Sequence, residues 1–357
     1  MDRFVECFGE IEDPRARNAQ HNLVELLFMA LLACLCGAKS CERMSEFGRS
    51  KEALLRRFLT LKHGIPSHDT FSRVFRIIDP KAFEGAFREF MAKFAQSLSG
   101  VVAVDGKALR GAYETGFSHM PRMMVGAFAA ETRLALAGLP AAGGNEKAAV
   151  LQLIELLSLK GCVVTADALH CHAEMAARII AGKGGYALRL KANQPKLLAQ
   201  AREALDGAGA KAARRDGVRH GRAETRSASV VPAAAMAART GFPGLKAVAR
   251  LVLERPGEKP EERFYLLSRR FAPERLTAIA RQHWSIENQQ HWVLDTVFAE
   301  DRARNRKDNA PENLAILRRL ALNVARLHPD RKTPLSRKLL RAGWNEKFFF
   351  ELIRHMR

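Results

Sequence analysis

Hydrophobic residues recur at helical spacing over the first hundred residues. An apolar run covers 23–38, and a second helical segment, EALLRRFLTL, follows it. In GIPSHDTFSRVFRIID, Ser67 is a candidate N-cap, and the apolar positions at helical spacing are Phe71, Val74, Phe75 and Ile78. The pattern predicts a helical N-terminal domain over residues 1–95.

The last of these helices has two interpretations. Gly64 and Pro66 interrupt the chain before it, which fits a helix-turn-helix that reads DNA. Its contacts would then come from Ser67, His68, Thr70 and Arg73. The turn residues are generic, so a capped helix in an ordinary bundle fits equally well. The sequence leaves both interpretations open.

Beyond residue 100, short apolar runs alternate with helical segments. The runs predict strands at 101–105, 123–129, 133–138, 162–166 and 185–190, with helices near 145–160 and 171–182. Three consecutive strands, a helix, and then strand, helix, strand is the order of a ribonuclease H-like sheet. The pattern therefore predicts an α/β core.

Two of these strands run into an aspartate. VVAVDGKALRG brings Asp105 to the end of one strand, and GCVVTADALHCH brings Asp167 to the end of another. Each Asp alone fits a turn or a helix N-cap. Together they predict a site for a hard divalent cation, because Mg²⁺ prefers carboxylate oxygens. Next to Asp105, Gly106 permits a close approach of backbone or phosphate, and Lys107 either contacts a DNA phosphate or faces solvent.

A polar segment near residue 290 offers a third acid. ERLTAIARQHWSIENQQHWVLDTVFAEDRARNR has the length and content of a helix, on which His283, Glu287, His291 and Asp295 follow at intervals of four residues and form one stripe. Trp284, Asn288 and Trp292 form the neighbouring stripe. We expect the aromatic stripe to pack inward beside the stripe of acids and histidines.

The acid and histidine stripe has three interpretations. The histidines could hydrogen-bond the acids and anchor the helix, a common arrangement in packed helices. A zinc protease is disfavoured, because His-Glu-x-x-His is absent. The remaining interpretation is a metal-binding acid of a nuclease, with Glu287 favoured over Asp295, Glu300 and Asp301.

The charge of the chain favours a polyanionic partner. Lys and Arg number 58 against 38 Asp and Glu, which gives a net charge of +20 and a pI of about 10.2. Residues 302–357 hold 15 Lys or Arg and 5 Asp or Glu, and so carry half of it. DNA is the first expectation, although a solvated basic helix face would give the same run. The basic positions in this region are Arg302, Arg304, Arg306, Arg318, Arg319, Arg331, Lys332, Arg337 and Lys338.

No membrane segment is expected. The apolar run at 23–38 contains Glu25 and is shorter than the ~20 residues of a spanning helix. Acids precede it where a signal peptide has cations. The 6 cysteines contain no Cys-x-x-Cys pair and suggest reduced thiols. We expect a cytoplasmic protein that associates with the nucleoid through DNA.

Several motifs resemble a known family. VDGKALRGA, TADALHCH, LRLKANQPKL, HGRAETR and RQHWSIENQQHWVLDTVFAED occur in the order of the blocks of bacterial insertion-sequence transposases of the DDE class, the ISAs-type (H-repeat-associated) family. FGEIEDPRARN and GIPSHDTFSRVF resemble the N-terminal region of the same family. The resemblance covers nearly the whole chain.

The resemblance implies a fold and an activity. Asp105, Asp167 and Glu287 would be the catalytic acids and would bind two Mg²⁺ (or Mn²⁺) ions on a ribonuclease H-like core. The expected α/β organisation is a helical, candidate DNA-binding domain at 1–95, the first part of the core at 96–205, a β-rich insertion at 206–269, a helical completion of the core at 270–325 and a basic tail at 326–357. The expected reaction is cleavage of double-stranded DNA at element ends and 3′-OH transfer into a target, by a homodimer on DNA. The alternatives are an inactive DNA-binding descendant and a metal-dependent DNA nuclease.

One signature of better-known relatives is missing. Their glutamate lies in Tyr-x2-Arg-x3-Glu-x6-Lys, whereas this chain has Ala280, His283 and Leu294 at the three other positions. The residues that could replace the missing cations at DNA are Lys107, Lys191, Arg222 and Arg281. Arg302, Arg304 and Arg306 are expected to contact the DNA backbone as well.

Overall fold

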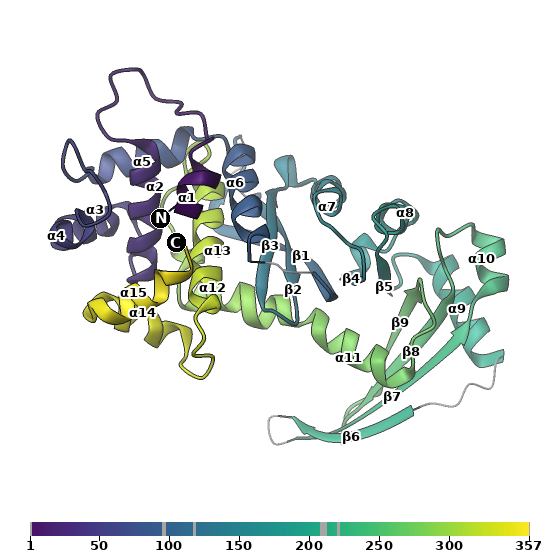
Figure 1. Cartoon of the computed structure of the whole chain (residues 1–357). Coiled ribbons are helices and arrows are strands. Elements are labelled where there is room, and N and C mark those ends of the chain that lie inside the picture. Colours follow the sequence, from purple (N-terminus) through teal and green to yellow (C-terminus); the bar gives the residue numbers. More distant parts are fainter. Residues whose placement is uncertain (1, 95–97, 117–118, 208–212, 220–221, 357) are drawn as a thin grey trace.

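One mixed sheet runs through the molecule (Figure 1). The computed structural model describes residues 2–94, 98–116, 119–207, 213–219 and 222–356. These residues form nine strands in the order β3-β2-β1-β4-β5-β9-β8-β7-β6. The strands are β1 (Gly100–Tyr113), β2 (Pro121–Ala129), β3 (Leu134–Pro140), β4 (Cys162–Ala166), β5 (Gly185–Leu190), β6 (Ala213–Arg219), β7 (Arg222–Pro232), β8 (Ala247–Glu254) and β9 (Glu261–Leu267). The fold is therefore mixed α/β.

The first five strands have the predicted order. β1 pairs with β2 in antiparallel fashion, β2 pairs likewise with β3, and β4 and β5 continue in parallel on the other side of β1. Helices α7 (Glu146–Glu155) and α8 (Ala173–Ala181) connect the later strands. Val102 and Val104 of β1 face these helices, while Ala103 packs on the opposite face with Ile286. Helices thus cover both faces of β1.

The first strand is longer than the sequence predicted. The expected strand ended at Asp105, but β1 continues to Tyr113 because residues beyond Asp105 keep pairing with β2. Pairing with β4 stops earlier, at Val104 and Ala166. Asp105 therefore lies inside one hairpin and just beyond the last residue that pairs with the parallel neighbour.

The β-rich segments after residue 206 extend the same sheet. β9 pairs with β5, and β8, β7 and β6 follow outward as an antiparallel series. Helices α9 (Pro195–Gly207) and α10 (Ala234–Thr240) lie beside this part of the sheet (Figure 1). The sequence predicted a β-rich insertion at 206–269, but it did not indicate that β9 would join this insertion to the core strands.

The helices of the two chain ends share one hydrophobic core. The N-terminal helices are α1 (Asp2–Phe8), α2 (Leu23–Leu35), α3 (Cys41–Ser50), α4 (Glu52–Leu55), α5 (His68–Ile77) and α6 (Pro80–Ala92). They pack with α13 (Ala310–Leu327), α14 (Leu335–Trp344) and α15 (Glu346–Ile353). In Figure 1 the purple and yellow ends of the chain lie side by side. Ser67 caps α5 by accepting a hydrogen bond from the Thr70 backbone N–H at 3.2 Å.

Part of the expected basic surface is buried. Arg318, Arg319 and Lys338 are 5%, 1% and 3% exposed, because α13 and α14 belong to this shared core. These three side chains are therefore not available to DNA phosphates in this structure, and the expectation that they contact phosphate is wrong here. Among the described residues, no helix is long and apolar enough to cross a membrane.

Candidate active site

The two aspartates lie side by side where the parallel pairing of β1 and β4 ends, a position called the strand edge below. Val104 of β1 and Ala166 of β4 are register partners, and Asp105 and Asp167 are the residues that follow them in the sequence. Adjacent strands are separated by about 5 Å. The register therefore brings together two carboxylates that are 62 positions apart in sequence.

Glu287 reaches this edge from an irregular helix. The predicted continuous helix is divided into α11 (Pro273–His283), a π-helical turn η3 (Ile286–His291) and α12 (Trp292–Thr296). Such turns are rare and occur frequently at functional sites. Ile286 is fully buried against β1 and β2, and the next residue, Glu287, is exposed. Glu287 lies close enough for its negative charge to act on Asp105.

The stripe at intervals of four residues faces the sheet. His283 Nδ1 lies 3.1 Å from Thr165 Oγ1 on β4, and His291 Nδ1 lies 3.7 Å from Asp105 Oδ2 on β1. The neighbouring aromatic stripe does not pack inward as expected. Trp292 is 62% exposed, since the buried positions of this helix are Ile286, Gln290 and Leu294.

The carboxylates at this edge repel one another. Burial raises the pKa of Asp105 to about 7, with further contributions from the negative charges of Glu287, Glu146 and Asp167. Burial, and then Asp167, raises the pKa of Glu287. Burial also acts to raise the pKa of Asp167, but the Ala168 backbone N–H and Lys191 outweigh it, so this pKa is lowered. Glu146 was not selected from the sequence.

The two histidines are neutral at physiological pH. Burial lowers the pKa of His283 to about 4 and that of His291 to about 3. The Nε2 atom of His291 is buried and has no hydrogen-bond partner among the described residues. Neither histidine forms a hydrogen bond with an acid, so the first interpretation of the stripe, in which both histidines bond to acids, does not describe the geometry.

Lys107 lies in a buried ionic cluster. Its side chain is 7% exposed, and its Nζ lies 2.7 Å from Asp295 Oδ1, 3.0 Å from Asp301 Oδ1 and 3.6 Å from Glu300 Oε2. Arg319 is within 3.3 Å of Glu300. Both sequence interpretations placed Lys107 at the surface. In the structure Lys107 instead links β1 to the end of the segment 273–296, called the Glu287 helix below, and to the acids that follow it. We therefore remove Lys107 from the proposed DNA contacts.

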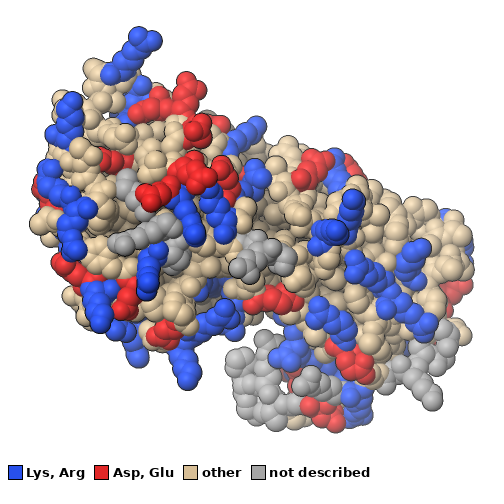
Figure 2. Space-filling model, in the orientation of Figure 1, with Lys and Arg blue, Asp and Glu red and all other residues tan. Residues whose placement is uncertain are grey.

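The other expected basic residues are at or near the surface. Lys191 follows β5 and forms an ion pair with Asp167 at 3.1 Å. Arg281, Arg302, Arg304 and Arg306 are exposed. The side chain of Arg222 lies outside the described part of the chain. Figure 2 shows Lys and Arg over both the helical end and the sheet extension, with smaller groups of Asp and Glu between them.

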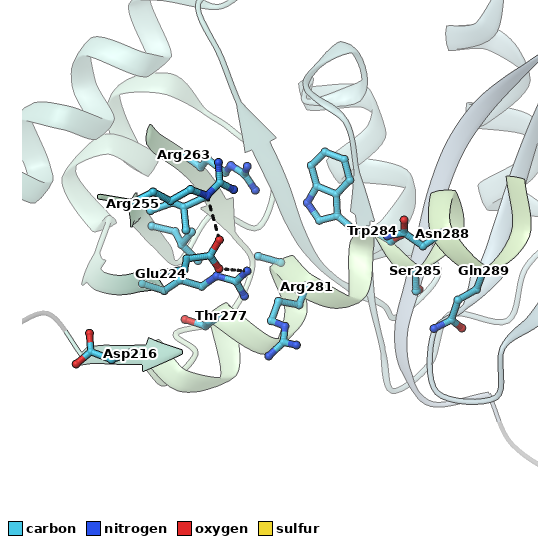
Figure 3. A pocket seen from close by; sticks show the side chains of 14 residues that line it. Asp216, Glu224, Arg255, Arg263, Thr277, Arg281, Trp284, Ser285, Asn288 and Gln289 are labelled. Atoms are coloured by element: carbon cyan, nitrogen blue, oxygen red, sulfur yellow. Dashed lines mark hydrogen bonds and ion pairs between the residues drawn. The ribbon is translucent and has the colours of Figure 1, made fainter. Parts of the chain in front are cut away.

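A basic pocket lies between the extended sheet and the Glu287 helix (Figure 3). It has a volume of about 510 Å³ and is lined from one side by β6, β7, β8 and β9 and from the other by α11 and η3. Its charged lining residues are Asp216, Glu224, Arg226, Arg255, Arg263 and Arg281. Arg263 lies 5.6 Å from the centre of the Trp284 ring. The pocket thus lies between the sheet extension that follows β5 and the helix that carries Glu287.

The donor chemistry at the strand edge fits a divalent cation. In the part of the chain that the structure describes, no group of three or more His, Cys, Asp or Glu side chains is arranged to hold a metal ion as it stands. Asp105, Asp167 and Glu287 nevertheless supply the hard oxygen donors that Mg²⁺ prefers. A divalent cation would relieve the repulsion that raises the pKa of Asp105 and Glu287.

Comparisons with known proteins show the family of this chain. The model of the family described as transposase DDE domain matches residues 96–324, and the DDE_Tnp_1-associated model matches residues 5–91. "Putative transposase YncI" of Escherichia coli O157:H7 is 31% identical, over 99% of this chain and 95% of its own length. "H repeat-associated putative transposase YhhI" of Escherichia coli K12 is 28% identical, over 99% of this chain and 98% of its own.

A solved structure is similar in fold. It is a cryo-EM structure of piggyBac transposase in a synaptic complex with hairpin DNA, with a TM-score of 0.51 and 11% identity. The match covers 99% of this chain and 80% of that one. With a family model over most of its length and full-length relatives, this chain belongs to the DDE transposase family.

Proposed function

We propose that this protein cuts DNA at the ends of an insertion sequence and transfers the freed 3′-OH ends into target DNA. The observation that carries the proposal is the register of β1 and β4, which places Asp105 and Asp167 side by side within the electrostatic reach of Glu287. Three carboxylates at this strand edge, beside a basic surface, suit phosphodiester chemistry.

Asp105, Asp167 and Glu287 would hold two Mg²⁺ or Mn²⁺ ions. When bound, such a pair supplies activation of the attacking oxygen and stabilisation of the leaving 3′ oxygen. The protein itself positions the groups. His283 and His291 remain uncharged and add no positive charge next to the acids, and the Lys107 cluster fixes the Glu287 helix against β1.

Lys191 is suited to a second task. Its ammonium lies 3.1 Å from Asp167 Oδ1, and its side chain is 44% exposed. A cation bound by Asp167 would compete with Lys191 for the carboxylate. We infer that Lys191 then turns to the DNA phosphate, together with Arg281 on the pocket wall.

The proposal is tested with full-length protein and double-stranded DNA that carries the ends of the encoding element. We expect Mg²⁺-dependent nicking at those ends and joining of the ends to a second DNA. Cutting without end preference or joining would favour the metal-dependent nuclease. Binding without any cutting, in Mg²⁺ or Mn²⁺, would favour the inactive DNA-binding descendant.

We expect Arg302, Arg304 and Arg306 to bind the DNA backbone. Replacing all three by Gln should weaken binding to any DNA sequence, because phosphate contacts carry no sequence information. The slope of log affinity against log salt concentration should fall by about 1 for each phosphate that is no longer neutralised. Fluorescence anisotropy at several salt concentrations measures both quantities.

A matched control uses cations at the other end of the strands. Lys160 and Lys183 are exposed and precede β4 and β5, whereas Asp167 follows β4. Replacing these two by Gln should leave the salt slope within about 0.5 of wild type, since they lie away from the acids. If the triple variant and wild type have equal slopes of log affinity against log salt concentration, the three arginines do not contact DNA phosphates.

A further inference from the structure

A fourth carboxylate approaches the acids from the opposite face of the sheet. Glu146 is the first residue of α7, which packs on the face of β1 that Val102 and Val104 share. Side chains alternate along a strand, so a Cβ at Gly106 would point to that same face. A Cβ added at Gly106 would lie 2.5 Å from Glu146 Oε1, so this carboxylate lies directly against the backbone of β1.

The carboxylate is held in place by a buried histidine. His170 Nε2 lies 3.0 Å from Glu146 Oε1 and donates to it, and the His170 side chain is only 1% exposed. His170 is three residues beyond Asp167, and Gly106 is the residue after Asp105. Glu146 therefore contacts the segments that follow both aspartates.

Stabilisation of the start of α7 alone does not account for the position of the Glu146 side chain. An acidic residue in the first turn of a helix stabilises the helix through the helix dipole, and this requires no contact with another strand. Glu146 instead has a side chain that is 20% exposed and is directed over the β1 backbone.

Building on the proposed function, we propose that Glu146 is a fourth carboxylate of the metal site, positioned by His170. It would share the divalent ions with Asp105 and Asp167 and would bind them directly or through their water. Its hydrogen bond to His170 then serves to orient the ligand, as partners of metal ligands commonly do.

The test compares Glu146→Gln with Glu155→Gln in the full-length protein. Glu155 is the last residue of the same helix, and its side chain is 57% exposed. Mn²⁺ binding is measured by isothermal titration calorimetry, DNA cleavage by the end-cutting assay, and folding by thermal unfolding. We expect Glu146→Gln to lower Mn²⁺ affinity at least about tenfold and to lower cleavage with it, while Glu155→Gln matches wild type.

Other results would overturn the proposal in distinguishable ways. If wild type binds Mn²⁺ and cuts DNA, and Glu146→Gln does both within twofold, Glu146 is not a ligand and the transposase activity stands. A lower melting temperature with unchanged Mn²⁺ affinity would make Glu146 a helix-stabilising residue only. If wild type neither binds Mn²⁺ nor cuts, the proposed function fails first. Glu146→Asp, which withdraws the carboxylate by one methylene, should also reduce Mn²⁺ affinity and serves if Glu146→Gln does not fold.

Discussion

Asp167→Asn should abolish DNA cleavage and leave DNA binding nearly intact. Burial acts to raise the pKa of Asp167, but the Ala168 backbone N–H and Lys191 outweigh it and lower this pKa, so the residue is ionised at neutral pH and supplies a charged ligand. The amide keeps the shape and loses the charge. We expect cleavage at the element ends to fall about a thousandfold or more, as when one member of a catalytic unit is removed. The measurement is the rate of Mg²⁺-dependent nicking at saturating protein.

The binding half of this prediction separates chemistry from folding. A gel shift with the same DNA should give an affinity within about threefold of wild type, because Lys and Arg contacts to phosphates dominate binding. Asp206→Asn is the matched control: this exposed residue of α9 forms an ion pair with Arg250, far along the sheet from β4. Asp206→Asn should cut normally. Normal cutting by Asp167→Asn would show that the acid assignment is wrong.

Lys107→Met should destabilise the fold strongly. The ammonium compensates Asp295, Glu300 and Asp301 in a largely buried cluster, and methionine fills similar space without the charge. Removal of one partner from a buried ionic cluster costs about 3–5 kcal/mol, because the remaining charges lose their compensation. We expect the free energy of unfolding, measured by urea titration, to fall by this amount.

An exposed lysine provides the comparison. Lys191→Met removes the ion pair with Asp167, in which both side chains are more than 40% exposed. Solvent screens this pair, so the loss should be about 0–1 kcal/mol. A loss of less than about 1 kcal/mol for Lys107→Met would show that the cluster tolerates its missing cation, for example by protonation of Asp295, whose pKa burial already raises.

The opposite fates of Lys107 and Lys191 illustrate the limit of sequence reasoning. Both follow a strand-forming segment, and both were candidates to contact DNA. In the structure the side chain of Lys107 is buried among three carboxylates of the segment 295–301, while Lys191 stays at the surface beside Asp167. Local sequence contains no information about the acids from distant segments that surround each cation.

The Glu287 helix shows the same division. Spacing of four residues grouped His283, Glu287, His291 and Asp295 on one stripe. In the structure three of them, His283, His291 and Asp295, contact residues of β1 and β4. The aromatic prediction failed because Trp292 faces solvent. The hydrophobic pattern did not predict the π-helical turn. Such a turn changes the backbone hydrogen bonds from i→i+4 to i→i+5 over a few residues, and this rotates the side chains that follow it.

Glu146 could have been found only in part. Asn145 followed by Glu146 marks the start of a helix, which the pattern had placed near 145–160. That signal indicates a cap and nothing more. The contact with His170 and the close approach to Gly106 depend on how α7 packs across the sheet.

Local pattern determined the elements of this protein. Apolar runs specified the strands of the core, and capping residues specified helix starts. Strand propensity next to Asp105 and Asp167 predicted that each aspartate follows a buried strand segment. Tertiary structure decided what those elements do together. Strand register placed the two aspartates side by side, β9 joined the extension to β5, and burial decided which cations remain available to DNA. The physical reason is that propensity and periodicity act over a few residues, whereas register, burial and charge compensation depend on contacts between distant segments.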